Sequence, residues 1–130
     1  MTNERFLLDT HFIQVLLNKR DQYHSKAQQF LPRLRAAREA WVTEAILVEV
    51  ANGLSAINRQ GIARFISHCY HTPNIHVVSV DSALFQQALA LYEARQDKTW
   101  GLTDCISFVV MEKNNLTDAV TADRDFAQAG

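Results

Sequence analysis

Short apolar runs alternate with longer amphipathic segments along this chain. The apolar runs predict strands at residues 5–8, 40–42, 74–80 and 118–122. The segments between them repeat their apolar positions every three or four residues and predict helices at 11–18, 21–38, 43–57, 62–70, 82–95 and 103–113. Pro32 is expected to kink or split the second helix, Gly61 to separate the third from the fourth, and Thr103 to cap the last.

The alternation of strands and helices predicts an α/β fold with a parallel sheet that is covered on both faces. In such sheets ligands bind beyond the carboxyl ends of the strands. Asp9 directly follows the first predicted strand, and Asp123 lies just past the last one, so both are candidates for a site at that edge.

Composition narrows the class of protein. With 130 residues, of which 48% are hydrophobic, the chain is expected to form one domain over residues 1–130. A net charge of −1 gives no global basic field that would indicate a nucleic-acid partner. Cys69 and Cys105 are expected to be free thiols in a reducing cytoplasm. No apolar run is long enough for a membrane span, and the N-terminus is too polar for a signal peptide.

The acidic residues at the ends of the predicted strands each have two interpretations. Asp9 is either the N-cap of the helix at 11–18 or a metal ligand or nucleophile at the sheet edge. Asp123 is either a turn residue or a second member of that site, and Asp125 two residues on complicates the choice. Thr121 has the same parity as Asp123, so an extended segment points both side chains the same way.

The acidic residues on the predicted helices are also ambiguous. Asp104 lies in a first helical turn, where the exposed N–H groups favour an acid without any catalytic role. Glu44 and Glu49 lie on opposite borders of the apolar stripe of the helix at 43–57, so periodicity does not choose between them. Glu44 is in the first turn and needs no special role, whereas Glu49 is either a solvated edge residue or part of a site.

Taken together, the acidic residues predict a metal site if they converge on one cleft. Two carboxylates about 4 Å apart repel by about 4 kcal/mol at an effective dielectric constant near 20. Hard divalent cations such as Mg²⁺ and Mn²⁺ prefer oxygen ligands and relieve that repulsion. A metal-activated water can then attack a phosphate.

The chain resembles PIN-domain proteins of the single-domain kind found among VapC-like toxin ribonucleases. The resemblance rests on "LLDTHF" (7–12), "TEAILVEVANGL" (43–54), "DKTWGLTDCISF" (97–108) and "TADRDF" (121–126), in that order. It implies a three-layer α/β/α sandwich with a central parallel sheet and an RNA-cleaving site that binds Mg²⁺ or Mn²⁺. It also implies an RNA substrate, a cognate antitoxin as partner and a homodimer.

Carried over by motif, the catalytic and metal-binding residues are Asp9, Glu49, Asp104 and Asp123, which selects Glu49 over Glu44. The supporting residues are Thr10, Asn52, Thr121 and Asp125. Asp125 stands where many relatives have histidine or another residue, so it either adds a fifth acid or faces solvent.

Other functions fit less well. A haloacid-dehalogenase-type phosphatase needs a second aspartate two residues after the first, where this chain has His11, and a receiver domain needs a late lysine after a strand, where it has Ala122-Asp123. The serious alternative is a non-catalytic protein- or RNA-binding module in which the acids are caps. Metal binding discriminates between the nuclease and the binding module.

The basic face formed by Arg33, Arg35 and Arg38 is expected to be solvated, with RNA contact as the minority interpretation.

Overall fold

The computed structural model describes residues 2–121, and its elements alternate as the sequence predicts. They are β1 (Arg5–Leu8), α1 (Thr10–Leu17), α2 (His24–Ala36), β2 (Glu39–Thr43), α3 (Glu44–His71), β3 (Ile75–Val78), α4 (Ser82–Ala94), α5 (Leu102–Lys113) and β4 (Ala119–Val120). The strands pair in the order β3-β2-β1-β4, and every pairing is parallel. The predicted α/β fold with a parallel sheet is therefore confirmed.

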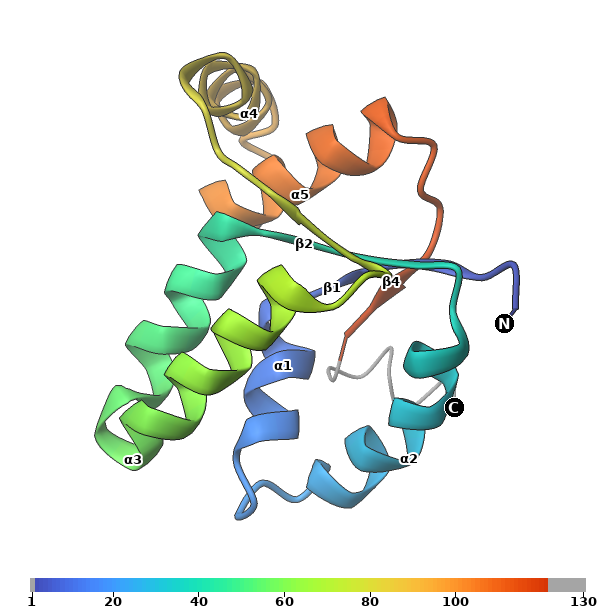
Figure 1. Cartoon of the computed structure of the whole chain (residues 1–130). Helices are drawn as coiled ribbons and strands as arrows, with labels where there is room; N and C mark the ends of the chain where they lie inside the picture. The colour runs from blue at the N-terminus through green and yellow to red at the C-terminus, as the bar shows by residue number, and fades with distance from the viewer. Residues whose placement is uncertain (1, 122–130) are drawn as a thin grey trace.

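The sheet lies between two layers of helices. Helices α1, α2 and α3 cover one face, and α4 and α5 cover the other (Figure 1). The core on the first face is built around Phe12 and Ile13 of α1, both fully buried, and Phe30 of α2 packs edge-on against Phe12 with ring centroids 5.9 Å apart. The core on the second face joins α4 to α5. This is the expected three-layer α/β/α sandwich.

The strand order places the carboxyl ends of β1 and β4 side by side. Leu8 pairs with Val120, and the backbone N–H of Asp9 donates to the carbonyl oxygen of Val120 at 3.0 Å. From β1 the chain continues to β2 on one side, whereas β4 lies on the other side. Ligands bind at such a switch point in parallel sheets, because the loops that follow the two strands diverge there and leave a crevice. Asp9 lies at this point.

Helix α2 continues through Pro32, so the expectation that this residue splits the helix was wrong. Proline lacks the N–H that would bond to the carbonyl oxygen four residues earlier, here that of Gln28. Both Pro32 and Gln28 are exposed, so water can take the place of the missing donor. The helix also begins later than predicted, at His24, because Asp21 accepts the backbone N–H of Tyr23 in a turn.

The break between the third and fourth predicted helices lies at Asn58 and not at Gly61. The backbone of Asn58 leaves helical geometry, with φ −159° and ψ 70°, and its side-chain Oδ1 accepts the backbone N–H of Gly61 at 3.0 Å. Asn58 is thus the cap of the second half of α3, in keeping with the preference of asparagine for such positions. The two halves form a hairpin whose tip projects from the body of the protein (Figure 1).

Cys69 and Cys105 are both buried free thiols, as predicted. Burial raises the pKa of Cys69 to about 11, so this thiol is protonated and unreactive at neutral pH. No helix within residues 2–121 is long and apolar enough to cross a membrane.

Candidate functional site

Asp9 occupies the first position after β1 and begins α1, but its carboxylate makes no capping hydrogen bond to the backbone of that helix. The backbone of Asp9 is extended, so the residue continues the strand direction and presents its half-buried side chain at the carboxyl edge of the sheet. Asp9 is therefore the N-cap by position but not through a side-chain hydrogen bond, and its side chain lies at this edge of the sheet.

Glu49 is brought to the same edge by a contact between α1 and α3. The hydroxyl of Thr10 donates to Oε1 of Glu49 at 2.8 Å, and the amide of Gln14 donates to the backbone carbonyl of Glu49 at 3.4 Å. Since Thr10 directly follows Asp9, this bond holds Glu49 beside the start of α1. Glu49 is exposed, which leaves its carboxylate open to a ligand. Sequence reasoning overlooked Gln14, although it lies one helical turn after Thr10.

Glu44 has different hydrogen-bond partners, although it lines the same surface hollow as Glu49. The hydroxyl of Tyr70 donates to Oε2 of Glu44 at 2.6 Å, and the backbone N–H of Val80 donates to Oε1 at 3.3 Å. Both carboxylate oxygens are therefore engaged in joining the start of α3 to its second half and to the segment before α4. The hydrogen bond to Glu44, together with burial and the charge of this carboxylate, raises the pKa of Tyr70 to about 12.

Asp104 lies in the first turn of α5, where it accepts the backbone N–H of Gly101 through Oδ2 at 3.0 Å. The helix begins at Leu102 with Gly101 at the N-cap, so the prediction that Thr103 caps this helix was wrong. The cap bond uses only one carboxylate oxygen and fixes the direction of the other. Burial, and then the negative charge of Asp104, raise the pKa of Cys105, which is the next residue in the chain.

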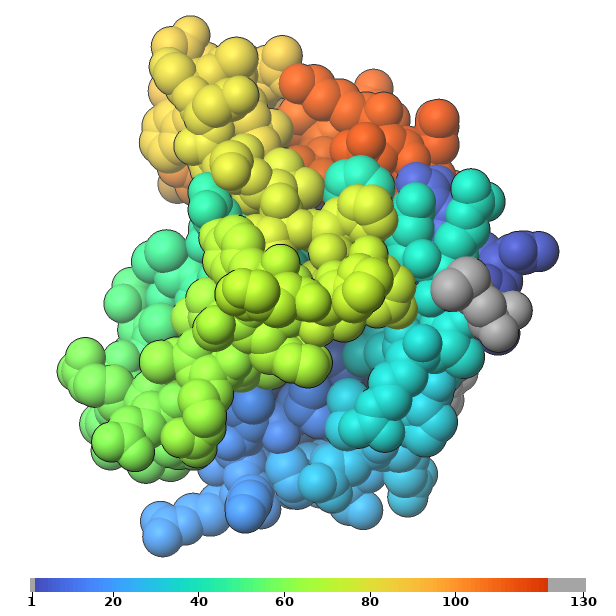
Figure 2. All heavy atoms as spheres, in the orientation of Figure 1, coloured from blue at the N-terminus to red at the C-terminus, as the bar shows by residue number. Residues whose placement is uncertain are grey.

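A hollow of about 350 Å³ joins the region of Glu49 to the start of α5. Glu44, Glu49 and Thr103, the residue before Asp104, line it. It is otherwise lined mostly by apolar side chains, and in Figure 2 the surface is indented where α4 meets the first half of α3. The acidic edge therefore has an apolar flank that is open to solvent.

The remaining predicted residues lie around this edge or beyond the described chain. Asn52 is exposed on α3, one helical turn after Glu49, and Thr121 directly follows β4. Asp123 and Asp125 lie outside the described residues. Within residues 2–121, no three His, Cys, Asp or Glu side chains lie close enough together to hold a metal ion. Because Asp123 is not among those residues, the four-carboxylate site stays a prediction.

Comparisons with known proteins identify the family. The family model for the PIN domain matches residues 6–130, so the chain belongs to the PIN-domain family. The crystal structure of Mycobacterium tuberculosis VapC20, a Sarcin-Ricin loop cleaving toxin, is similar in fold with a TM-score of 0.80. The two chains are 22% identical, and the match covers 96% of this chain and 95% of that one. A search of curated proteins found no match.

The environment of Glu44 predicts a measurable titration. Replacing Glu44 with Gln should lower the pKa of Tyr70 from about 12 towards the ordinary value near 10, because the charged acceptor that stabilises the neutral phenol is lost. In the wild type the folded-state pKa exceeds the unfolded one, so this contact stabilises the fold fully below about pH 10 and is lost as the pH rises through 12.

The measurement is the pH dependence of the tyrosine ring carbon resonances by NMR. Glu49→Gln is the matched control and should leave the pKa of Tyr70 unchanged. An unchanged Tyr70 titration in Glu44→Gln would show that Glu44 does not hold Tyr70.

Proposed function

We propose that this protein is a divalent-metal-dependent endoribonuclease and the toxin of a type II toxin–antitoxin pair. The observation that carries the proposal is the Thr10–Glu49 hydrogen bond, which brings the acid of α3 to the strand end that bears Asp9. This arrangement lies in a PIN domain that spans residues 6–130. The similar protein VapC20 is a toxin that cleaves the Sarcin-Ricin loop.

The chemistry of the proposed ligands fits a hard cation. Nucleases of the PIN family generally use divalent metal ions. The side chains at this edge offer carboxylate and hydroxyl oxygens, which are the ligands that such ions prefer. Asp9, Glu49, Asp104 and Asp123 would hold Mg²⁺ or Mn²⁺. Asp9 follows β1, Glu49 lies on α3 and Asp104 on α5, so the proposed site would combine acids from three separate parts of the fold.

The protein's own residues act by position and charge. A bound divalent cation supplies positive charge that neutralises the phosphate and activates a water for attack. Thr10 restrains the rotamer of Glu49, and the N–H of Gly101 restrains Asp104, so the carboxylates do not reorganise when RNA binds. Without the four acids, the formal charge changes from −1 to −1 + 4 = +3, so the remaining surface attracts an anionic substrate.

The alternative is a non-catalytic PIN-like module that binds protein or RNA. It is favoured by the cap bond of Asp104, which gives this acid a structural role of its own. Asp9 makes no such cap bond, and Glu49 is exposed in the middle of a helix, so capping does not account for these two acids. Cleavage assays with paired variants distinguish the two functions.

Purified protein should cleave single-stranded or loop RNA in the presence of Mg²⁺ or Mn²⁺ and should stop in EDTA. Glu49→Gln should reduce the rate by roughly 100-fold or more, because it removes a charge that acts on the reacting centre. Glu44→Gln is the matched control, with the same change five residues earlier in the same helix, and should retain most of the activity. The rate should fall as much in Asp9→Asn, Asp104→Asn and Asp123→Asn as in Glu49→Gln. It should fall much less in Asp125→Asn.

End-group analysis tests the chemistry. Attack by water leaves a 5′ phosphate and a 3′ hydroxyl, because the 2′ hydroxyl takes no part. Products with 2′,3′-cyclic phosphates, or cleavage that persists in EDTA, would refute the mechanism. Equal activity in the two glutamate variants would favour the binding module.

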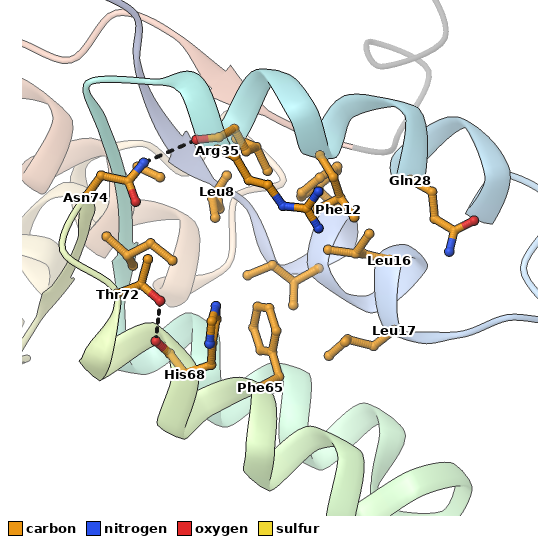
Figure 3. A pocket seen from close by; sticks show the side chains of 15 residues that line it. Leu8, Phe12, Leu16, Leu17, Gln28, Arg35, Phe65, His68, Thr72 and Asn74 are labelled. Atoms are coloured by element: carbon orange, nitrogen blue, oxygen red, sulfur yellow. Dashed lines mark hydrogen bonds between the residues drawn. The ribbon is translucent and has the colours of Figure 1, made fainter. Parts of the chain in front are cut away.

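For the antitoxin we propose a docking site in a second cavity, between α1, α2 and the second half of α3 (Figure 3). It has a volume of about 340 Å³, and no acidic side chain lines it. Its walls are mainly leucine, isoleucine and phenylalanine, whereas Arg35 and His68 bring polar groups from α2 and α3 to the cavity. Arg35 makes no ion pair within residues 2–121. The cavity therefore suits apolar side chains of a partner that also carries an acidic residue.

Arg35→Glu should weaken the complex with the protein encoded by a small reading frame beside this gene, because like charges would face each other. Arg38→Glu is the matched control, since this exposed arginine carries the same charge and does not line the cavity. Affinities from calorimetry should fall at least tenfold for Arg35→Glu and little for Arg38→Glu. Equal losses would indicate a general electrostatic effect and not a docking site at the cavity.

We also propose that the protein is a homodimer that associates through the apolar surface of α4 and the start of α3. Phe85, Leu89 and Tyr92 lie on one face of α4 and are 42–48% exposed, and Val48 of α3 is 57% exposed and lines the same hollow as Phe85. A contiguous exposed apolar surface of this kind is typical of an interface.

Leu89→Lys should convert the dimer to a monomer in light scattering, whereas Ile57→Lys, at the exposed tip of α3, should not.

A further inference from the structure

Ser107 is the only residue within residues 2–121 that buries a side-chain N or O atom without a hydrogen-bond partner. Its side chain is on α5, and the residue is 5% exposed. A buried hydroxyl without a partner loses its hydration and gains nothing in return, so such groups are rare in folded proteins. Where one occurs, an ordered water or a ligand commonly accounts for it.

The position of Ser107 on α5 relates it to the acidic edge. Ser107 follows Asp104 by three residues and precedes Met111 by four, so the three side chains share one side of the helix. Met111 packs against the core cluster that contains the residues of β1 and Val120 of β4. Cys105 and Ile106, on another side of α5, belong to the cluster that contains Leu84 and Ala88 of α4. Ser107 therefore lies on the side of α5 that faces the sheet, one turn deeper than Asp104.

A local hydrogen bond could have satisfied this hydroxyl but is not made. Serine in a helix often donates to the carbonyl oxygen four residues earlier, and Ser55 of α3 donates to Ala51 in this way. The hydroxyl of Ser107 makes no such bond to Thr103. The fold therefore leaves the Ser107 hydroxyl without a partner, one helical turn after Asp104 and on the same side of α5.

We infer that Ser107 is a positioning residue of the proposed metal site, where its hydroxyl hydrogen-bonds a water of the hydration shell of the bound ion. This inference rests on the proposed function. Mg²⁺ keeps several of its waters when it binds to protein carboxylates, and those waters need acceptors and donors from the protein. Groups that contact the hydration shell or the ligands affect metal affinity strongly without binding the metal themselves.

The test is Ser107→Ala, measured by the affinity for Mn²⁺ and by the melting temperature of the metal-free protein. The affinity for Mn²⁺ should fall roughly tenfold, because the water loses its partner. The melting temperature without metal should stay the same or rise, because the variant removes a buried group that has no partner and alanine favours a helix. Ser55→Ala is the matched control, since it removes a helical serine whose hydroxyl donates to the carbonyl oxygen of Ala51, and it should leave the affinity for Mn²⁺ unchanged.

The outcomes separate this inference from the function on which it rests. Wild-type affinity for Mn²⁺ in Ser107→Ala would overturn the role of Ser107 and leave the metal site intact. A fall in the melting temperature of metal-free Ser107→Ala would show a structural role and would also overturn the inference. If the wild-type protein itself does not bind Mn²⁺, the proposed function fails together with the role of Ser107.

Discussion

The position of β1 between β2 and β4 is the constraint on which the rest of the structure depends. It makes the first strand of the chain a central strand, and it places the residue after that strand at the switch point of the sheet. The backbone bond from Asp9 to Val120 holds the ends of β1 and β4 in register. An acid at this position is costly to bury unless a partner compensates its charge, which is why Asp9 is a candidate for a site.

The two layers of helices contribute to this edge in different ways. On one face, Thr10 of α1 holds Glu49 of α3, so a contact between helices sets the position of the acid. On the other face, Asp104 is held by the N-terminus of its own helix, so local geometry sets its position. The first arrangement depends on the packing of α1 against α3 around Phe12, Ile13 and Val50, whereas the second needs only α5. A change in the core of the first layer would therefore displace Glu49 before it displaced Asp104.

Glu44 and Glu49 show how neighbouring acids in one helix acquire different environments. Both lie at the border of the apolar stripe of α3, but the first half of the helix packs between two sets of neighbours. Glu44 meets Tyr70 and the backbone of Val80, and both its oxygens are engaged there. Glu49 meets one hydroxyl donor and keeps an exposed carboxylate. Glu44 joins segments of the chain, whereas Glu49 is the acid proposed for the metal site.

The sequence by itself determined the strands, most of the helices and the class of fold, because alternating apolar runs and amphipathic segments depend on local burial. It also indicated Asp9, since a carboxylate directly after an apolar strand is unusual. Hydrophobic periodicity did not separate Glu49 from Glu44, because that choice depends on Thr10 and Tyr70, which are 39 and 26 residues distant from their partners. Hydrogen bonds and packing likewise decided the break at Asn58, the N-cap of α5 at Gly101 and the burial of the Ser107 hydroxyl. Only the tertiary structure determines which donor reaches which acceptor, because the partners are distant in the sequence and hydrophobic periodicity does not depend on them.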